Sequence, residues 1–547
     1  MIGLNKIWLN QVQLNRLYLN APFPVYRKMT GGGSSGDGFP VLPGDVTRWH
    51  FGGLTNEMMA AMDDPRLEDA DGKGRFLSFK NFAWKGMSGV GGVSTYYDKY
   101  EFTPDKYYMV AVSSGTQHAQ FTFKVTGLVD GNTLSLADTS SPSNVYGKWT
   151  QDGIYTVDID VINTDRSLYF YNGVSATRGE FTIEILPLYP GALIFDGVDD
   201  YGTCDNFPIP TKEKGYTVVA LRQWITRGEI AQGLVSNVKD WFNDGAFLLE
   251  YRNVNANYFN SPMSFGTIGS EKDLPHILTY QTSKSYNGVS IITGNFTGTD
   301  VLYVGKLATR NVGICINAAI WELVFLDHDA TEEELTKIKD YFVKTYPWLF
   351  PDQAWTVTGK TNEDEDRATI ANITGNGNDL VLSNFGFIEG SGYNEEGEYA
   401  GYLVTDGVDD KITSSTFEMG NDWTVIGDWE LINTGKNDNA GIVKFDSIVI
   451  YNYNPILINI KNSGNHLIPD QNTVNAICSD GRIYSKDWKE SIYNEETEST
   501  SKNFLTIGYS GNSYTKIAFK NLAFYPTVLS KEDCIKAYNY LQTLKAK

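Results

Sequence analysis

The chain is poor in cysteine, histidine and basic residues, and each shortage narrows what it can be. The four cysteines, Cys204, Cys315, Cys478 and Cys534, lie far apart without CxxC spacing, so we expect buried free thiols and no zinc site. The five histidines form no metal-ligand pair at helical or strand spacing. With 45 Lys and Arg against 66 Asp and Glu, the net charge of −21 argues against general nucleic-acid binding.

Long apolar runs are also missing. No stretch approaches the roughly 18 apolar residues that a membrane span needs. The start of the chain does not read as a signal peptide, because polar residues such as Lys6, Asn10 and Asn15 interrupt its apolar run. We therefore expect no membrane-spanning segment.

The chain begins with a repeat: Leu-Asn recurs every five residues from Leu4 to Asn20. Such a segment is apolar all round as a helix or a strand and cannot bury its own side chains. Residues 1–36 also contain no Asp or Glu. We predict that residues 1–30 anchor the protein to a partner chain, and that residues 31–38, a Gly- and Ser-rich stretch, form a flexible tether. The anchoring side chains would be Leu4, Ile7, Trp8, Leu9, Leu14, Leu17, Tyr18 and Leu19.

The rest of the chain repeats itself once. DGKGRFLSFKNFAWKGMSG, from Asp71, matches TGNGNDLVLSNFGFIEGSG, from Thr374, and ALIFDGVDDYGT matches YLVTDGVDDKIT. Each copy closes with a strand and a helix, with Thr331 and Ser530 at N-cap positions. The body is therefore a duplicated domain, and its many Gly, Tyr and Asp-Gly residues predict short strands joined by tight turns.

The two copies differ by one insertion. Gly89 and Asp196 are 107 residues apart, whereas their counterparts Gly392 and Asp406 are 14 apart, so the first copy carries about 93 extra residues. This insert contains strand-like alternation in AQFTFKVTG, YTVDIDV and EFTIEIL. We predict a separate small β-sandwich at 93–190.

The order of these motifs resembles the concanavalin A-like, or laminin-G-like, jelly-roll domain. The resemblance implies an all-β protein with two such sandwiches, each ending in a short helix: domain 1 at 39–92 with 191–350, and domain 2 at 351–547. The Leu-Asn-Lys-Ile-Trp-Leu opening with its Gly/Ser tether is similar to short repeats that head virion appendage proteins of tailed, crAss-like gut phages. That second resemblance implies a head or tail fibre.

Catalytic patterns are absent from the sequence. Glycoside hydrolases with this jelly roll carry carboxylates in an ExDxE-type spacing on one strand. Here Glu322 and Asp327 are five residues apart and should face opposite sides of a regular strand. The sequence around Ser88 also lacks the last Gly of a nucleophile elbow. We therefore expect no catalytic residues and no enzymatic activity.

The repeated DGVDD motif allows two interpretations. Clustered carboxylates such as Asp196, Asp199 and Asp200 could bind Ca²⁺. Alternatively, Asp-Gly forms a turn in which Gly accepts positive φ and Asp binds nearby backbone amides. We favour the turn, and we expect no metal and no cofactor, with Ca²⁺ as the open alternative.

Sugar sites need aromatic rings beside polar groups. Trp241, Tyr251 and Trp488 lie in polar, loop-like sequence and are the candidate glycan-binding residues, although packing in the core or at its rim is the alternative for each. Together these features predict a non-enzymatic virion structural protein that joins capsid or tail proteins through residues 1–30 and binds host surface glycans. We expect a homo-oligomer and favour a trimer. A secreted or cell-surface glycan-binding protein is the alternative, and a glycanase is the third possibility.

Overall fold

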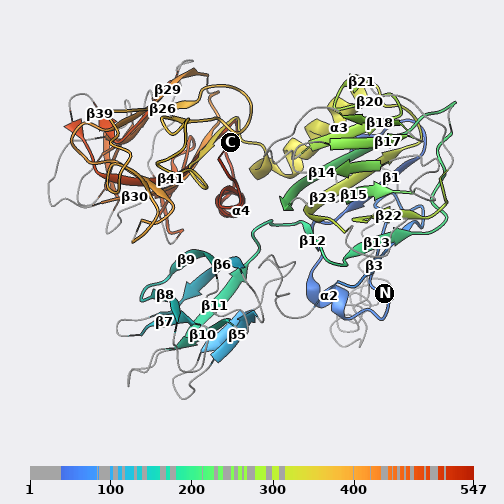
Figure 1. Cartoon of the computed structure of the whole chain (residues 1–547), viewed down its shortest axis with the longest axis horizontal. Helices are drawn as coiled ribbons and strands as arrows, with labels where there is room; N and C mark the ends of the chain where they lie inside the picture. Colours follow the sequence, from blue (N-terminus) through green and yellow to red (C-terminus); the bar gives the residue numbers. More distant parts are fainter. Residues whose placement is uncertain are drawn as a thin grey trace, which may run out of the picture. The chain divides into compact units, whose positions relative to one another are not determined.

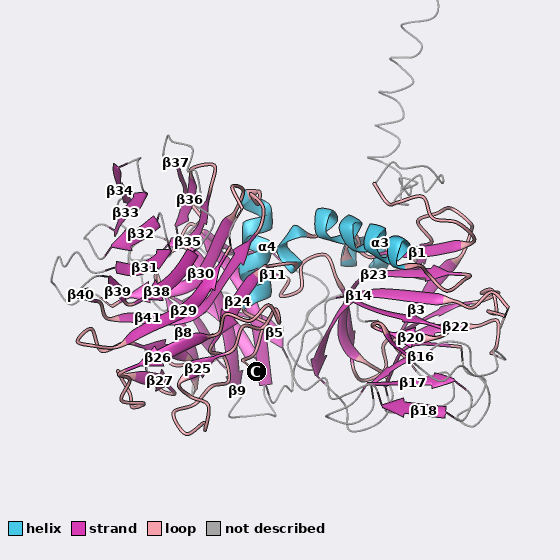
Figure 2. Cartoon of the chain, turned by 90° about the horizontal axis from the view of Figure 1, so that it is seen from above, coloured by secondary structure: helices cyan, strands magenta, loops and turns pink. Residues whose placement is uncertain are grey.

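Strands make up most of the described chain (Figures 1 and 2). The structure is a computed structural model. It describes residues 38–546 apart from gaps at 83, 85–98, 103–108, 114–117, 129–131, 138–143, 161–167, 173–179, 212, 227–231, 238–247, 252–256, 262–263, 268–277, 291–297, 307–314, 398, 419, 433–440, 446–447, 452–455, 461–463, 469–473, 486–487, 493–502 and 511–512. The predicted anchor and most of the tether lie outside the described residues.

The described residues fall into two compact units. Residues of 38–96, 191–271 and 276–341 form the first, and residues of 97–190 and 342–547 form the second. The domain boundaries expected from the sequence stay predictions. Within the described part of the chain, no helix is long and apolar enough to cross a membrane.

The first unit contains two antiparallel sheets. One runs β1-β23-β14-β19-β20-β21, with β12 also paired to β23, and the other runs β18-β17-β16-β15-β22-β13-β3-β2. The strands of the first sheet are β1 (Val46–His50), β12 (Leu193–Asp196), β14 (Thr217–Thr226), β19 (Leu278–Thr282), β20 (Ser285–Tyr286), β21 (Val289–Ser290) and β23 (Asn317–Leu326). Those of the second are β2 (Arg66–Glu68), β3 (Phe76–Lys80), β13 (Tyr201–Cys204), β15 (Gln232–Ser236), β16 (Leu248–Tyr251), β17 (Asn257–Ser261), β18 (Ser264–Thr267) and β22 (Leu302–Val304).

Residues 351–547 contain two sheets with the same strand order, apart from one additional strand, β27. One runs β27-β28-β41-β30-β35-β36-β37, with β24 paired to β41, and the other runs β25-β26-β29-β38-β31-β32-β33-β34. The first sheet holds β24 (Gln353–Thr356), β27 (Gly392–Asn394), β28 (Tyr402–Val404), β30 (Thr424–Leu431), β35 (Val474–Cys478), β36 (Arg482–Ser485), β37 (Glu490–Ile492) and β41 (Ile517–Tyr525). The second holds β25 (Thr369–Ile370), β26 (Leu380–Ser383), β29 (Lys411–Phe417), β31 (Gly441–Phe445), β32 (Ile448–Tyr451), β33 (Ile456–Ile460), β34 (Gly464–Ile468) and β38 (Asn503–Ile507). A short hairpin, β39 (Tyr509–Ser510) with β40 (Ser513–Tyr514), stands apart from both.

In each copy the two sheets enclose one hydrophobic core. Trp49 of β1, Leu77 of β3 and Phe325 of β23 belong to the first core, and Trp355 of β24 and Phe524 of β41 to the second. The two tryptophans are fully buried, so each core is built around an indole ring. The all-β prediction is confirmed, and the shared strand order supports the duplication read from the sequence.

The insert forms two four-stranded sheets, β5-β10-β7-β8 and β4-β11-β6-β9. Their strands are β4 (Lys99–Phe102), β5 (Met109–Ser113), β6 (His118–Thr126), β7 (Leu134–Ala137), β8 (Val145–Trp149), β9 (Gly153–Asp160), β10 (Leu168–Asn172) and β11 (Phe181–Leu186). Phe121 of one sheet packs edge-on against Phe170 of the other, with ring centroids 5.8 Å apart. Residues 181, 183 and 185 are buried in alternation, as predicted.

Among the described residues the helices are α2 (Asn56–Ala60), α3 (Glu332–Thr345), the 3₁₀ helix η1 (Pro347–Leu349) and α4 (Lys531–Leu541). Both predicted N-caps are confirmed. The Glu334 N–H donates to Thr331 Oγ1 at 3.3 Å, and the Asp533 N–H donates to Ser530 Oγ at 3.1 Å. Glu334 also accepts from the Thr331 N–H at 2.8 Å, which completes a capping box.

Candidate functional site

The DGVDD motif forms the same turn in both copies. Asp406 Oδ1 accepts hydrogen bonds from the N–H groups of Val408, Asp409 and Asp410 at 2.7, 3.2 and 3.3 Å. Asp196 makes the equivalent three bonds in the first copy. Gly407 adopts φ 76°, a left-handed conformation that favours glycine. The predicted turn is confirmed, because one carboxylate oxygen is occupied by three backbone donors.

A second repeated motif holds this turn in place. Asn384 has φ 70° and donates its side-chain amide to the Asp409 carbonyl at 3.0 Å. Asn81 does the same to the Asp199 carbonyl at 2.9 Å, with φ 69°. The Asn side chain of the Asn-Phe motif therefore holds the DGVDD turn in both copies, and we call the two motifs together the clamp. The sequence showed both motifs but did not show that they are in contact.

The three carboxylates of each motif also lie close together. Within the described residues, ligand atoms of Asp406, Asp409 and Asp410 lie within 4.8 Å of one another, as do those of the first copy's triad. Burial, together with the Asp196 charge, raises the pKa of Asp200 to about 7, and burial raises the pKa of Asp410 to about 6. Such groups can take up a proton near neutral pH, and Ca²⁺ at these positions stays an open alternative.

Beside the two triads, a tyrosine and a lysine have exchanged positions between the copies. In the first copy Tyr201 follows the turn and Lys306 follows β22, with the Lys306 ammonium 4.2 Å from the Tyr201 ring centroid. At the equivalent positions the second copy has Lys411 and Tyr509, at 5.9 Å. Ring and cation have changed places, so the cation–π contact is kept from the opposite strand.

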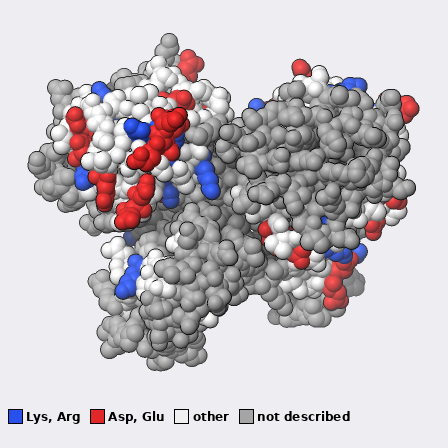
Figure 3. Space-filling view, in the orientation of Figure 1, with Lys and Arg blue, Asp and Glu red and all other residues white. Residues whose placement is uncertain are grey.

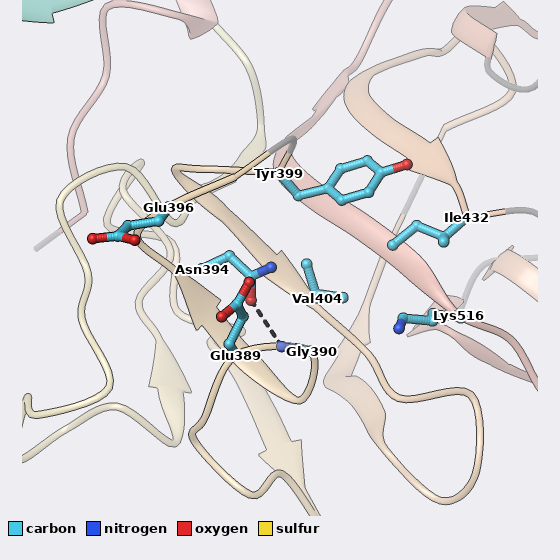
Figure 4. Close-up of a pocket in the computed structure, with 8 residues that line it drawn as sticks. All are labelled: Glu389, Gly390, Asn394, Glu396, Tyr399, Val404, Ile432 and Lys516. Carbon is cyan, nitrogen blue, oxygen red and sulfur yellow. Dashed lines mark hydrogen bonds between the residues drawn. The ribbon is translucent and has the colours of Figure 1, made fainter.

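A polar cavity of about 430 Å³ lies beside the clamp of the second copy (Figure 4). Its lining residues are Glu389, Gly390, Asn394, Glu396, Tyr399, Val404, Ile432 and Lys516. Half of them belong to the hairpin of β27 and β28. Glu389 and Gly390 precede β27, and the other two come from the chain after β30 and before β41. We call this cavity the hairpin pocket.

Hydrogen bonds fix the hairpin pocket on the sandwich. Asn394 Oδ1 accepts from the Gly390 N–H at 3.0 Å, and the neighbouring Tyr393 exchanges backbone bonds with the Asn362 side chain at 2.8 and 2.7 Å. On the other wall, the Lys516 carbonyl accepts from the Ile432 N–H at 3.1 Å. Figure 4 shows the Glu389 carboxylate and the Asn394 amide converging, while the Glu396 carboxylate points away from the Tyr399 ring.

The hairpin that supplies half of the pocket lining occupies the place where the first copy carries its insert. Gly392 and Asp406 flank this hairpin, and their counterparts Gly89 and Asp196 flank the insert. The two copies have therefore diverged at the same connection. Sequence reasoning missed the pocket, although the stretch EGSGYNEEGEYAG, rich in Gly, Tyr and Glu, was a signal at that connection.

The predicted glycan-binding residues have different outcomes. Trp241 lies outside the described residues, and Tyr251 ends β16 with its side chain outside them. Trp488 is only 4% exposed, and its ring packs against Tyr484 and Tyr538, with centroids 6.1 and 5.7 Å apart. The prediction that Trp488 offers a ring to a sugar is therefore wrong, and the packing alternative holds.

Glu322 and Asp327, the acidic residues considered for catalysis, are both engaged in structural contacts. Glu322 is fully buried, with Arg48 Nη1 2.8 Å from Oε1 and His50 Nδ1 3.2 Å from Oε2. Asp327 accepts from the Asp45 N–H at 2.9 Å and pairs with Lys214 at 3.2 Å. Both carboxylates thus hold strands and loops together.

No protein-family model matches the chain, and no curated protein sequence matches it. Among solved structures, a Trypanosoma rangeli sialidase in complex with sialic acid is similar over 86% of this chain and 82% of its own, at 8% identity and a TM-score of 0.27. The receptor-binding domain of botulinum neurotoxin D is similar over 63% of this chain and 90% of its own, at 11% identity and a TM-score of 0.26. Likenesses this distant carry no argument about the site.

Proposed function

We propose that the protein is a non-enzymatic glycan-binding protein of a phage particle, a head or tail fibre that is anchored by residues 1–30 and works in the virion. The hairpin pocket is the observation that carries glycan binding. It combines the half-buried ring of Tyr399, the Asn394 amide and the Glu389 carboxylate around a cavity of about 430 Å³. Sugars need a ring for their CH-rich faces and polar groups for their hydroxyls.

Rigid placement supports this assignment. Asn394 and Val404 lie in β27 and β28, Asn394 holds the Gly390 N–H, and the Lys516 carbonyl holds the Ile432 N–H, so little conformational entropy would be lost at these walls when a ligand binds. The exposed residues of the second sandwich include Glu363, Glu365 and Glu395, and Figure 3 shows acidic side chains gathered on one face there. Such a surface repels anionic polymers in general and leaves recognition to specific contacts.

The virion assignment is supported by the opening repeat, which is apolar, free of acidic residues and followed by a tether. A homo-oligomer, with a trimer favoured, would present several weak sites together and raise avidity by roughly 10² or more. A secreted or cell-surface glycan-binding protein could use the same pocket. Such a protein would not need the opening repeat. A glycanase would need two free carboxylates facing one sugar, and the orientation of Glu396 in Figure 4 speaks against Glu389 and Glu396 as that pair.

A glycan array probed with the full chain tests the proposal. We expect binding that Tyr399→Leu reduces at least tenfold, because the substitution removes the ring face and keeps an apolar side chain. Tyr280→Leu is the matched control, since Tyr280 is also half-buried and lies in the first unit on β19. Binding that survives in Tyr399→Leu, or that falls equally in both variants, would contradict the hairpin pocket as the site.

A further inference from the structure

Two cysteines meet inside the second sandwich. Cys478 ends β35 and Cys534 lies in the first turn of α4, and both side chains are fully buried. Their thiols are hydrogen-bonded to each other. Elements far apart in the sequence therefore bring the two sulfur atoms together.

A hydrogen bond between Thr424 and Leu529, which we call the link, lies beside both sulfur atoms. Thr424 Oγ1 lies 3.7 Å from Cys478 Sγ and accepts a hydrogen bond from the Leu529 N–H at 2.9 Å. The Leu529 carbonyl lies 4.0 Å from Cys534 Sγ. Because the link joins β30 to the segment before α4, the two thiols are fixed on both sides.

The first copy has the link without the cysteines. Thr217 Oγ1 accepts from the Ala330 N–H at 2.7 Å, as Thr424 does from Leu529. Thr217 pairs with Thr282, just as Thr424 pairs with Cys478, so Thr282 is the counterpart of Cys478. Aligning the N-caps Thr331 and Ser530 makes Leu335 the counterpart of Cys534. The thiol pair is therefore an addition to a shared scaffold, which needs no cysteine there.

We propose that Cys478 and Cys534 are a modification site: in an oxidising environment they form a disulfide that ties α4 to β35, with a low-molecular-weight disulfide as the oxidant. Cys478 attacks as thiolate, breaks the reagent's S–S bond and expels one thiolate. Cys534 then loses its proton and attacks the Cys478 sulfur of the mixed disulfide, which expels the second thiolate. Two thiols are oxidised to one disulfide, and one reagent disulfide is reduced to two thiols, which take up the two protons.

The local chemistry supports this order of attack. The hydrogen bond from Cys534 lowers the pKa of the Cys478 thiol, whereas the bond to Cys478 and burial raise the pKa of the Cys534 thiol. Because both groups are buried, the reagent reaches them only during folding or when α4 loosens locally.

The experiment uses the full chain with Cys204→Ser and Cys315→Ser, which leaves only the proposed pair. The protein is refolded from urea with oxidised glutathione and is also incubated folded. After refolding we expect the loss of the mass of two hydrogens and one cross-linked peptide that contains Cys478 and Cys534. The reciprocal variant, Cys478→Ser with Cys534→Ser, keeps two thiols that are also buried, Cys204 and Cys315, and should form no disulfide.

Two results would overturn the proposal: the pair stays reduced after oxidative refolding, or each cysteine ends with its own glutathione. If the Cys204→Ser and Cys315→Ser variant does not fold, peptide mapping of the unsubstituted chain after the same treatment gives the same answer. A peptide linking Cys478 to Cys204 or to Cys315 would also count against the pair.

Discussion

Replacing Gly407 by alanine tests how tightly the DGVDD turn packs on the wall of the hairpin pocket. A Cβ at Gly407 would lie 3.1 Å from the Lys516 backbone nitrogen and 3.2 Å from Lys516 Cβ. The Lys516 segment cannot move away freely, because its carbonyl holds the Ile432 N–H. The substitution also places alanine at φ 76°, which L-residues rarely adopt.

Gly401 provides the matched control. Its φ is 80° and a Cβ there meets no atom within 4 Å, so Gly401→Ala carries the conformational cost alone. We expect that cost to be about 1 kcal/mol. Gly407→Ala should add the cost of overpacking, about 1–3 kcal/mol more. The difference between the two variants isolates the contact with Lys516.

Hydrogen exchange of the full chain measures both costs. The amides of β28 and β41 report the free energy of opening of the second sandwich, and those of β12 and β23 serve as an internal reference. Equal losses in Gly401→Ala and Gly407→Ala would refute the packing argument. In that case only the left-handed backbone would explain glycine at position 407.

Three further predictions concern Asp410, the opening repeat and the second sandwich expressed alone. The pKa of Asp410 is raised to about 6 from its usual 3.8, so its contribution to stability is complete below pH 3.8 and is lost as pH rises through 6; Asp410→Asn should flatten this fall in urea unfolding of the second sandwich between pH 4 and 7, and an unchanged slope would contradict it. Deleting residues 1–30 should leave a soluble, folded body that no longer joins the particle, and normal incorporation, measured on purified virions, would contradict the anchor. Residues 351–547 expressed alone should fold cooperatively in circular dichroism melts, because they hold a complete core, and an unfolded product would contradict the boundary.

Local patterns were enough to predict much of the fold. The alternation in EFTIEIL gave β11, the spacing of Thr331 and Glu334 gave a capping box, and Asp-Gly gave the turn at 406–410. Each of these features depends on residues within a few positions of one another. The duplication was visible because both copies kept such local signals in the same order.

Long-range contacts were the part that the sequence did not show. Trp488 has polar neighbours in the sequence, yet its ring is covered by Tyr538 of α4, 50 residues later. The hairpin pocket depends on Lys516 reaching a hairpin more than a hundred residues earlier. Polar neighbours in the sequence are therefore a poor guide to the exposure of a residue when a distant helix or strand covers its side chain.

The insert also has a practical consequence, which follows from how its ends pair. Its first strand, β4, lies antiparallel to its last strand, β11, with Lys99 opposite Glu184. The chain therefore enters and leaves the insert at the same end. For the first sandwich, the insert is equivalent to a long loop between two strands. The second copy closes the same connection with a hairpin of a few residues. At this junction, a foreign domain with adjacent termini could therefore replace the insert while both sheets of the first sandwich keep their register.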